Sequence, residues 1–193
     1  MKIGVFDSGL GGLSILKVLR KRLPDYDYLY LGDNLHVPYG NRLHKEIIFL
    51  ARKIIPFFIE KNCALVVFAC NTITAVALPT IQKEFNGKIK VLGIIRPTSE
   101  FLADHHFGEI GFIGTTNTVK ANIFYNDFKN VAPKKELVLC QNDCPGLVEE
   151  IEKGDLEGKN LKKILTACLA PLKKERIDAL VLGCTHYNLI ARQ

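Results

Sequence analysis

Residues 64–72 read ALVVFACNT, an apolar run that ends at Cys70 and is followed by two small polar residues. Residues 179–186 read ALVLGCTH and repeat this pattern around Cys184. Short runs of consecutive apolar residues are typical of strands that are buried in a parallel sheet. Because open parallel sheets bind ligands at the carboxyl ends of their strands, we expect both thiols at a ligand-binding edge.

The two halves of the chain look related beyond the cysteines. Residues 3–8 read IGVFDS and residues 110–115 read IGFIGT, so each half opens with an Ile-Gly strand that ends at a hydroxyl residue. Short apolar runs alternate with helix-period segments along the whole chain, which favours an α/β fold. We therefore predict two pseudo-symmetric domains with mainly parallel sheets flanked by helices, residues 1–95 and 96–193, with the active site in the cleft between them.

The periodicity also predicts the elements of these domains. Two prolines, Pro56 and Pro171, fall inside helical patterns and are expected to kink or split them. The expected strands are residues 2–6, 26–31, 65–69, 89–94, 109–113, 135–139 and 179–182. The expected helices are residues 13–22, 43–61, 75–85, 99–105, 119–129, 147–153 and 161–174.

Composition limits the class of protein. With 193 residues, 48% hydrophobic and 24% charged, the chain resembles ordinary soluble globular proteins. Asp7 interrupts the first apolar run, so we expect no signal peptide, and no run is long enough to span a membrane. We therefore expect a cytoplasmic protein whose six cysteines are reduced and form no zinc site. The net charge of +6 is attributed to solvated helix faces, and without a recognisable binding motif no nucleic-acid partner is expected.

Two loops join the thiols as candidate binding segments. Residues 7–12 read DSGLGG and lie between the first strand and the first helix, where backbone amides can meet a carboxylate. A tight structural turn is the alternative explanation of these glycines. In the loop after the second strand, Tyr39 offers a hydroxyl and Gly40 an unhindered amide, or else this loop is a plain turn.

Polar residues next to each thiol leave two mechanisms open. Asn71 and Thr72 follow Cys70, and Thr185 and His186 follow Cys184. In a Cys-His hydrolase or acyl transferase, His186 would activate Cys184 as a nucleophile, and Cys70 would have no role. In a two-base proton transfer, one thiolate removes a proton from a carbon stereocentre and the opposite thiol returns one.

Four segments together resemble the bacterial glutamate racemases of the aspartate/glutamate racemase superfamily. They are residues 6–12, 37–41, 69–72 and 183–187, which occur in the order and with spacing similar to those of that family. The resemblance implies a cofactor-independent racemase, free of pyridoxal phosphate and metal, that interconverts L- and D-glutamate for peptidoglycan synthesis. It also implies a homodimer. A racemase of another amino acid, such as aspartate, and a non-catalytic binding protein remain alternatives.

The resemblance further implies roles for individual residues. Cys70 and Cys184 would be the two catalytic acid/bases, assisted by Asp7 and His186 respectively. The substrate would be bound by Asp7, Ser8, Tyr39, Gly40, Asn71, Thr72, Thr115, Thr118, Thr185 and His186.

The chain departs from the family pattern at two places. Asn34 and His36 stand where the family usually has Thr or Ser and Arg. The chain also ends soon after His186, whereas glutamate racemases continue with a segment that returns to the first domain. We therefore expect a C-terminally shortened racemase that keeps its substrate-contacting residues and is weakly active, unstable or dependent on oligomer formation.

Overall fold

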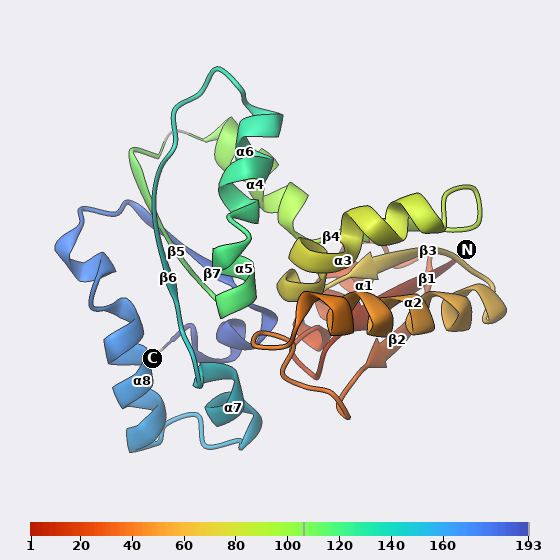
Figure 1. The fold of residues 1–193 in the computed structure, drawn as a ribbon, viewed down its shortest axis with the longest axis horizontal. Coiled ribbons are helices and arrows are strands. Elements are labelled where there is room, and N and C mark those ends of the chain that lie inside the picture. The colour runs from red at the N-terminus through yellow and green to blue at the C-terminus, as the bar shows by residue number, and fades with distance from the viewer. Residues whose placement is uncertain (106, 193) are drawn as a thin grey trace. The chain divides into compact units, whose positions relative to one another are not determined.

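A computed structural model describes residues 1–105 and 107–192. The chain forms two compact units, Met1–Ile94 and Ile95–Gln193, which we call the first and second unit. Each unit contains one sheet whose strands are all parallel. The predicted α/β class with two parallel sheets is thereby confirmed (Figure 1).

The first unit is a four-stranded sheet with helices on both faces. Its strand order is β2-β1-β3-β4, so the first strand of the chain lies inside the sheet. Its elements are β1 (Lys2–Asp7), α1 (Leu13–Arg22), β2 (Asp27–Gly32), α2 (His44–Glu60), β3 (Cys63–Phe68), α3 (Asn71–Glu84) and β4 (Lys90–Gly93).

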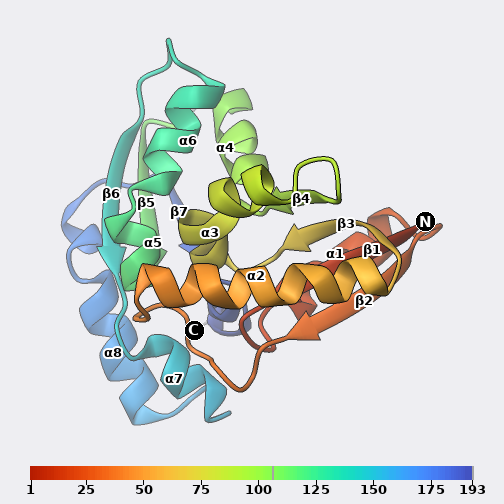
Figure 2. The ribbon, with the colours of Figure 1, turned by 45° about the vertical axis from the view of Figure 1, so that its right-hand side comes forward.

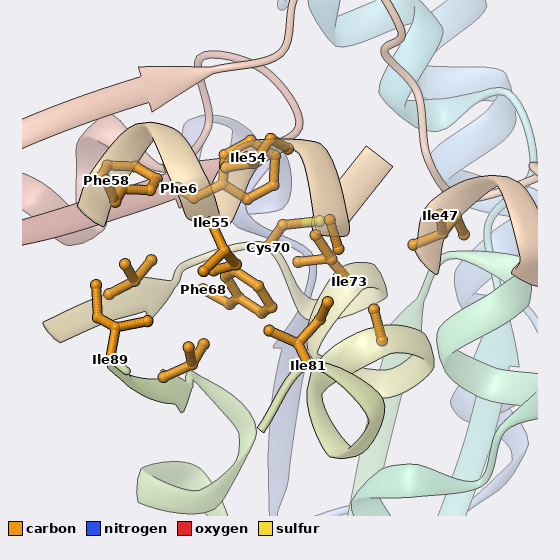
Figure 3. Packing of buried hydrophobic residues seen from close by; sticks show 14 of the residues in the cluster. Phe6, Ile47, Ile54, Ile55, Phe58, Phe68, Cys70, Ile73, Ile81 and Ile89 are labelled. Carbon is orange, nitrogen blue, oxygen red and sulfur yellow. The ribbon is translucent and has the colours of Figure 1, made fainter. Parts of the chain in front are cut away.

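Successive side chains of β1 point to opposite faces of the sheet, so they contribute to two separate clusters of buried residues. Ile3 and Val5 belong to the cluster that α1 covers. Phe6 belongs to the larger cluster, which α2 and α3 cover on the other face. Figure 3 shows the sulfur of Cys70 among the side chains of this larger cluster, with Ile55, Phe68 and Ile73 around it. Cys70 is therefore held by the main core of the unit.

The second unit has a three-stranded sheet with the order β6-β5-β7. Figures 1 and 2 both show α4 and α6 side by side. Its helices are α4 (Ile95–Asp104), α5 (Thr116–Lys120), α6 (Ile123–Val131), α7 (Leu147–Glu152) and α8 (Lys159–Leu169), and its strands are β5 (Glu109–Gly114), β6 (Val138–Asp143) and β7 (Ala179–Gly183). Two 3₁₀ segments complete it, η1 (Leu172–Lys174) and η2 (Thr185–Ile190).

The strands of the two units follow the same plan. In each, the first strand lies between the second and the third, so β2-β1-β3 corresponds to β6-β5-β7. One backbone hydrogen bond recurs as well: the Asp33 amide donates to the Asp7 carbonyl at 3.0 Å, and the Cys144 amide donates to the Gly114 carbonyl at 3.0 Å. Cys70 and Cys184 each follow the third strand of their unit. The two thiols therefore occupy equivalent positions.

The effects of the two prolines differ. Helix α2 runs from His44 to Glu60 without a break at Pro56, so the expected split there is wrong (Figure 2). Near Pro171 the expectation is confirmed, because α8 ends at Leu169 and a short 3₁₀ turn follows. Proline lacks the amide that would continue the helical hydrogen bonds.

Other elements also differ from the pattern, and α4, for example, begins at Ile95 rather than at the expected residue 99. The expected helix 119–129 is divided between α5 and α6, because Asn122 adopts a left-handed conformation with φ of 46°. The expected strand 135–139 lies later, at Val138–Asp143. Its polar residues are accommodated by side-chain hydrogen bonds, such as Asn142 Nδ2 donating to the Cys168 carbonyl at 2.6 Å.

The expectation that all cysteines are reduced is wrong. Cys144 and Cys168 form a disulfide with Cα atoms 5.2 Å apart, whereas all six cysteines were expected to be reduced. Cys63, Cys70, Cys140 and Cys184 are reduced thiols. In the described parts of the chain, no helix has the length and apolar character needed to cross a membrane.

Candidate active site

Cys70 lies at the carboxyl end of β3 and is the N-cap residue of α3. Only 6% of its surface is exposed. Its sulfur lies 3.5 Å from the Ser8 hydroxyl oxygen, and the backbone amides of Thr72 and Ile73 favour the thiolate form. These amides belong to the first turn of α3, where the helix leaves N–H groups without partners inside the helix. The turn after Cys70 therefore provides amides that stabilise a thiolate.

Opposing influences act on the pKa of Cys70. Burial raises this pKa, and the negative charge of Asp7 raises it further. The Ser8 hydroxyl and the two amides of α3 act in the opposite direction but do not cancel the rise. The protein without substrate thus holds Cys70 as a thiol. A cation close to the sulfur, such as the ammonium group of an amino acid, would favour the thiolate.

Asp7 is fully buried at the end of β1. Its Oδ2 accepts the Gly9 amide at 3.1 Å. A Cβ atom on Gly12 would lie 2.5 Å from the Asp7 Cβ and 2.9 Å from the Tyr30 hydroxyl oxygen. The close approach at Gly12 is therefore an approach of the chain to its own Asp7 and Tyr30, which agrees with the structural-turn explanation of this glycine.

Tyr39 joins the same region from the loop between β2 and α2. Its ring is almost completely buried and packs in the cluster that contains Cys70. Its hydroxyl donates to Asp33 Oδ2 at 2.7 Å. The pKa of Tyr39 is raised by burial, by this hydrogen bond, and by the charges of Asp33 and Cys70. Tyr39 is therefore a neutral phenol.

The remaining first-unit candidates lie at the same sheet edge. Gly40 and Thr72 are buried, and Asn71 is partly buried as the first residue of α3. We call Asp7, Ser8, Tyr39, Gly40, Cys70, Asn71 and Thr72 the first-unit site. Asp33 was not among the predicted site residues, although its position directly after the second strand could have indicated a role at this sheet edge.

In the second unit, Cys184 follows β7 and is 7% exposed. Its sulfur lies 3.7 Å from Nδ1 of His186. The other ring nitrogen, Nε2, lies 2.5 Å from Glu152 Oε1 at the end of α7. A carboxylate in this position orients the imidazole ring and determines which ring nitrogen carries the proton. Thiol, imidazole and carboxylate thus form one connected chain.

Glu152 was also absent from the sequence analysis. It is 34 residues from His186 along the chain, on a helix with other acidic residues. The sequence pattern therefore contained no signal for this pairing. The geometry adds Glu152 to the candidate residues.

Threonines line the same edge of the second sheet. The hydroxyl oxygens of Thr115 and Thr118 are 2.9 Å apart, and both residues are buried after β5. Thr185 is buried beside Cys184. Tyr187 donates to the Gly114 carbonyl at 3.3 Å, and burial, followed by the charge of Cys184, raises its pKa. We call Thr115, Thr118, Glu152, Cys184, Thr185 and His186 the second-unit site.

Fold and sites define a two-unit α/β protein with one buried thiol at a strand end of each unit. Residues 13–193 match the family model described as Asp/Glu/Hydantoin racemase. The chain belongs to this racemase family.

Similar proteins agree with this assignment. The chain is 40% identical over 189 residues to glutamate racemase 3 of Caldanaerobacter subterraneus subsp. tengcongensis, covering 97% of this chain and 67% of the relative. The crystal structure of a glutamate racemase isoform from Bacillus anthracis matches with a TM-score of 0.88 and 33% identity, over 98% of this chain and 70% of the other. Glutamate racemase from Francisella tularensis in complex with D-glutamate matches with a TM-score of 0.87 and 33% identity, over 99% and 71%.

Proposed function

We propose that this chain interconverts L- and D-glutamate by two-base proton transfer, and that the D-glutamate serves peptidoglycan synthesis. The observation that carries this proposal is the equivalence of Cys70 and Cys184, each buried after the third strand of its unit. The relatives named glutamate racemase support glutamate as the substrate. A cytoplasmic location and a homodimer complete the proposal.

In the proposed reaction, one thiolate removes the α-proton of glutamate and becomes a thiol. The electron pair of the broken C–H bond remains on the α-carbon and its carboxylate. The opposite thiol then gives its proton to the other face of the α-carbon and becomes a thiolate. Protons balance over one turnover, and the reverse reaction exchanges the two roles.

The partners of each thiol suggest how the proton transfers are assisted. Asp7 and the first-turn amides of α3 act on Cys70, and His186 with Glu152 acts on Cys184. Hydroxyls and backbone amides of Ser8, Asn71, Thr72, Thr115, Thr118 and Thr185, together with Tyr39 and Gly40, bind the carboxylates and the ammonium group. Donors that are already oriented stabilise the charge that develops on the substrate.

The deciding experiment follows glutamate in D₂O. Circular dichroism reports racemisation, and deuterium at the α-carbon reports proton removal. We expect wild-type protein to do both. Cys70→Ser and Cys184→Ser should each abolish racemisation, while Cys184→Ser retains exchange with one enantiomer at most. Cys140→Ser is the matched control, because Cys140 is a free, half-buried thiol in neither site, and should racemise normally. Full racemisation by Cys70→Ser would exclude the proposal.

A second candidate function is supported by the connected chain of Cys184, His186 and Glu152. A thiol, a histidine and an orienting carboxylate are also the components of a cysteine hydrolase or acyl transferase. Such an enzyme would form a covalent acyl-thiol at Cys184 and would not need Cys70. Acyl transfer that survives Cys70→Ser but not Cys184→Ser, without racemisation by the wild type, would favour this candidate. A thermal shift with glutamate but no turnover would instead indicate a binding protein.

A further inference from the structure

His36 contacts the first-unit site through Asp33. Its Nδ1 lies 2.8 Å from Oδ1 and 2.9 Å from Oδ2 of Asp33. The second of these oxygens also accepts the Tyr39 hydroxyl at 2.7 Å. One carboxylate thus joins the histidine to the tyrosine.

The backbone of the loop holds this arrangement in place. The Asp33 amide donates to the Asp7 carbonyl at 3.0 Å, and the His36 amide donates to the Asp33 carbonyl at 3.2 Å. Arg42 Nε donates to the His36 carbonyl at 2.6 Å. The His36 main chain is therefore fixed on both sides, which limits the positions that its ring can adopt.

The side chains of His36, Asp33 and Tyr39 are increasingly buried, in that order. The exposed fractions are 37% for the His36 side chain and 15% for the Asp33 side chain, and Tyr39 is 1% exposed. Tyr39 packs in the same cluster as Cys70. A change of charge at the exposed end can therefore reach the buried hydroxyl through one shared carboxylate.

We propose that His36 is a positioning residue of the first-unit site, whose Nδ1–H holds the Asp33 carboxylate and thereby orients the Tyr39 hydroxyl. This inference rests on the proposed racemase function. A hydroxyl has one proton, and Tyr39 directs it to Asp33. Its oxygen lone pairs are then oriented as acceptors, which suits an ammonium group rather than a carboxylate.

The contact requires a particular protonated nitrogen of the ring. Nδ1 must carry a proton to donate to a carboxylate, in either the neutral or the charged ring. The charged groups next to the contact are Arg42, which donates to the His36 carbonyl, and Glu46 of α2, 3.7 Å from Arg42. An arginine in place of His36 would also offer N–H donors to the Asp33 carboxylate.

The test compares His36→Ala, His36→Arg and wild type in glutamate racemisation. We expect His36→Ala to lower kcat/KM about tenfold, the effect of losing one hydrogen bond to a charged group. His36→Arg should restore most of the activity, because its guanidinium can also donate to the Asp33 carboxylate.

Controls separate this inference from the proposed function. His44, an exposed residue at the start of α2, supplies the matched variants His44→Ala and His44→Arg, which should behave like wild type. Normal kinetics of His36→Ala, or no recovery of activity in His36→Arg, would overturn the positioning role. Nitrogen NMR of the wild-type imidazole tests the same inference without turnover. A proton on Nδ1 supports it, and an unprotonated Nδ1 overturns it, even if the wild type does not racemise glutamate.

Discussion

The two thiols differ in the residues that assist them. The first-turn amides of α3 and the buried carboxylate of Asp7 both affect the pKa of Cys70, whereas Cys184 is next to an imidazole. Helix amides stabilise a thiolate without taking part in proton transfer. An imidazole can carry a proton itself, so the second-unit site has a further place to store one.

Glu152 is the residue whose substitution tests this difference. Glu152→Gln removes the negative charge beside His186 Nε2 but keeps a similar shape. The imidazole loses the carboxylate that orients it, so we expect kcat for racemisation to fall at least tenfold, about 1.4 kcal/mol, with little change in KM. Steady-state kinetics by circular dichroism measure both constants.

Glu150→Gln provides the matched control on the same helix. Glu150 pairs with the exposed Lys153, and neither residue contacts His186 in the interactions described above. We expect wild-type kinetics from this variant. Equal losses for both variants would show that α7 acts through its overall charge rather than through Glu152.

At the scale of elements, the start of α3 determines where Cys70 lies. The helix begins at Asn71, although the pattern predicted a start at residue 75. Residues 71–74 read NTIT and have weak helix propensity. The Thr74 hydroxyl lies 2.9 Å from the Cys70 carbonyl and 3.3 Å from the Phe68 carbonyl, so it connects this first turn to the end of β3. Helix propensity does not take this connection into account.

Thr74→Val tests whether this hydroxyl holds the turn. The variant keeps the shape of the side chain but leaves two buried carbonyls without this donor, so we expect a loss of about 1–2 kcal/mol in the free energy of unfolding. Urea unfolding measures it. Thr74→Ser retains the hydroxyl and should recover most of the loss. If both variants lost the same amount, the methyl group rather than the hydroxyl would be responsible.

The candidate site shows what a single sequence can predict. Apolar runs that end in small polar residues correctly located both cysteines at strand ends, because strand burial is a local property of the chain. The partners Asp33 and Glu152 were missed, because their contacts depend on how distant or irregular segments fold together. The disulfide between Cys144 and Cys168 was missed for the same reason.

At the scale of the whole molecule, buried thiol and phenol groups make the free energy of unfolding depend on pH. Burial raises the pKa of Cys70, Tyr39 and Tyr187 above the values of the unfolded chain. Above about pH 8.5 the unfolded chain begins to lose protons that the native protein retains. The native state then binds more protons than the unfolded state, so the free energy of unfolding decreases as pH rises.

Urea unfolding between about pH 7 and pH 10 checks this prediction, with a slope of up to about 1.4 kcal/mol per pH unit for each group. Cys70→Ser removes the thiol and should flatten the first part of the decline. A free energy of unfolding that stays constant or rises across this range would contradict the prediction.

The shared strand plan of the two units has a consequence for their evolution. Duplication of one ancestral unit would supply two thiols with identical neighbours. Later substitutions in one copy make them unequal: Asp7 ends β1 where Gly114 ends β5, and Asn71 follows one thiol where Thr185 follows the other. Each copy is a separate target for selection. Divergence of one copy can change the residues around one thiol while those around the other stay unchanged.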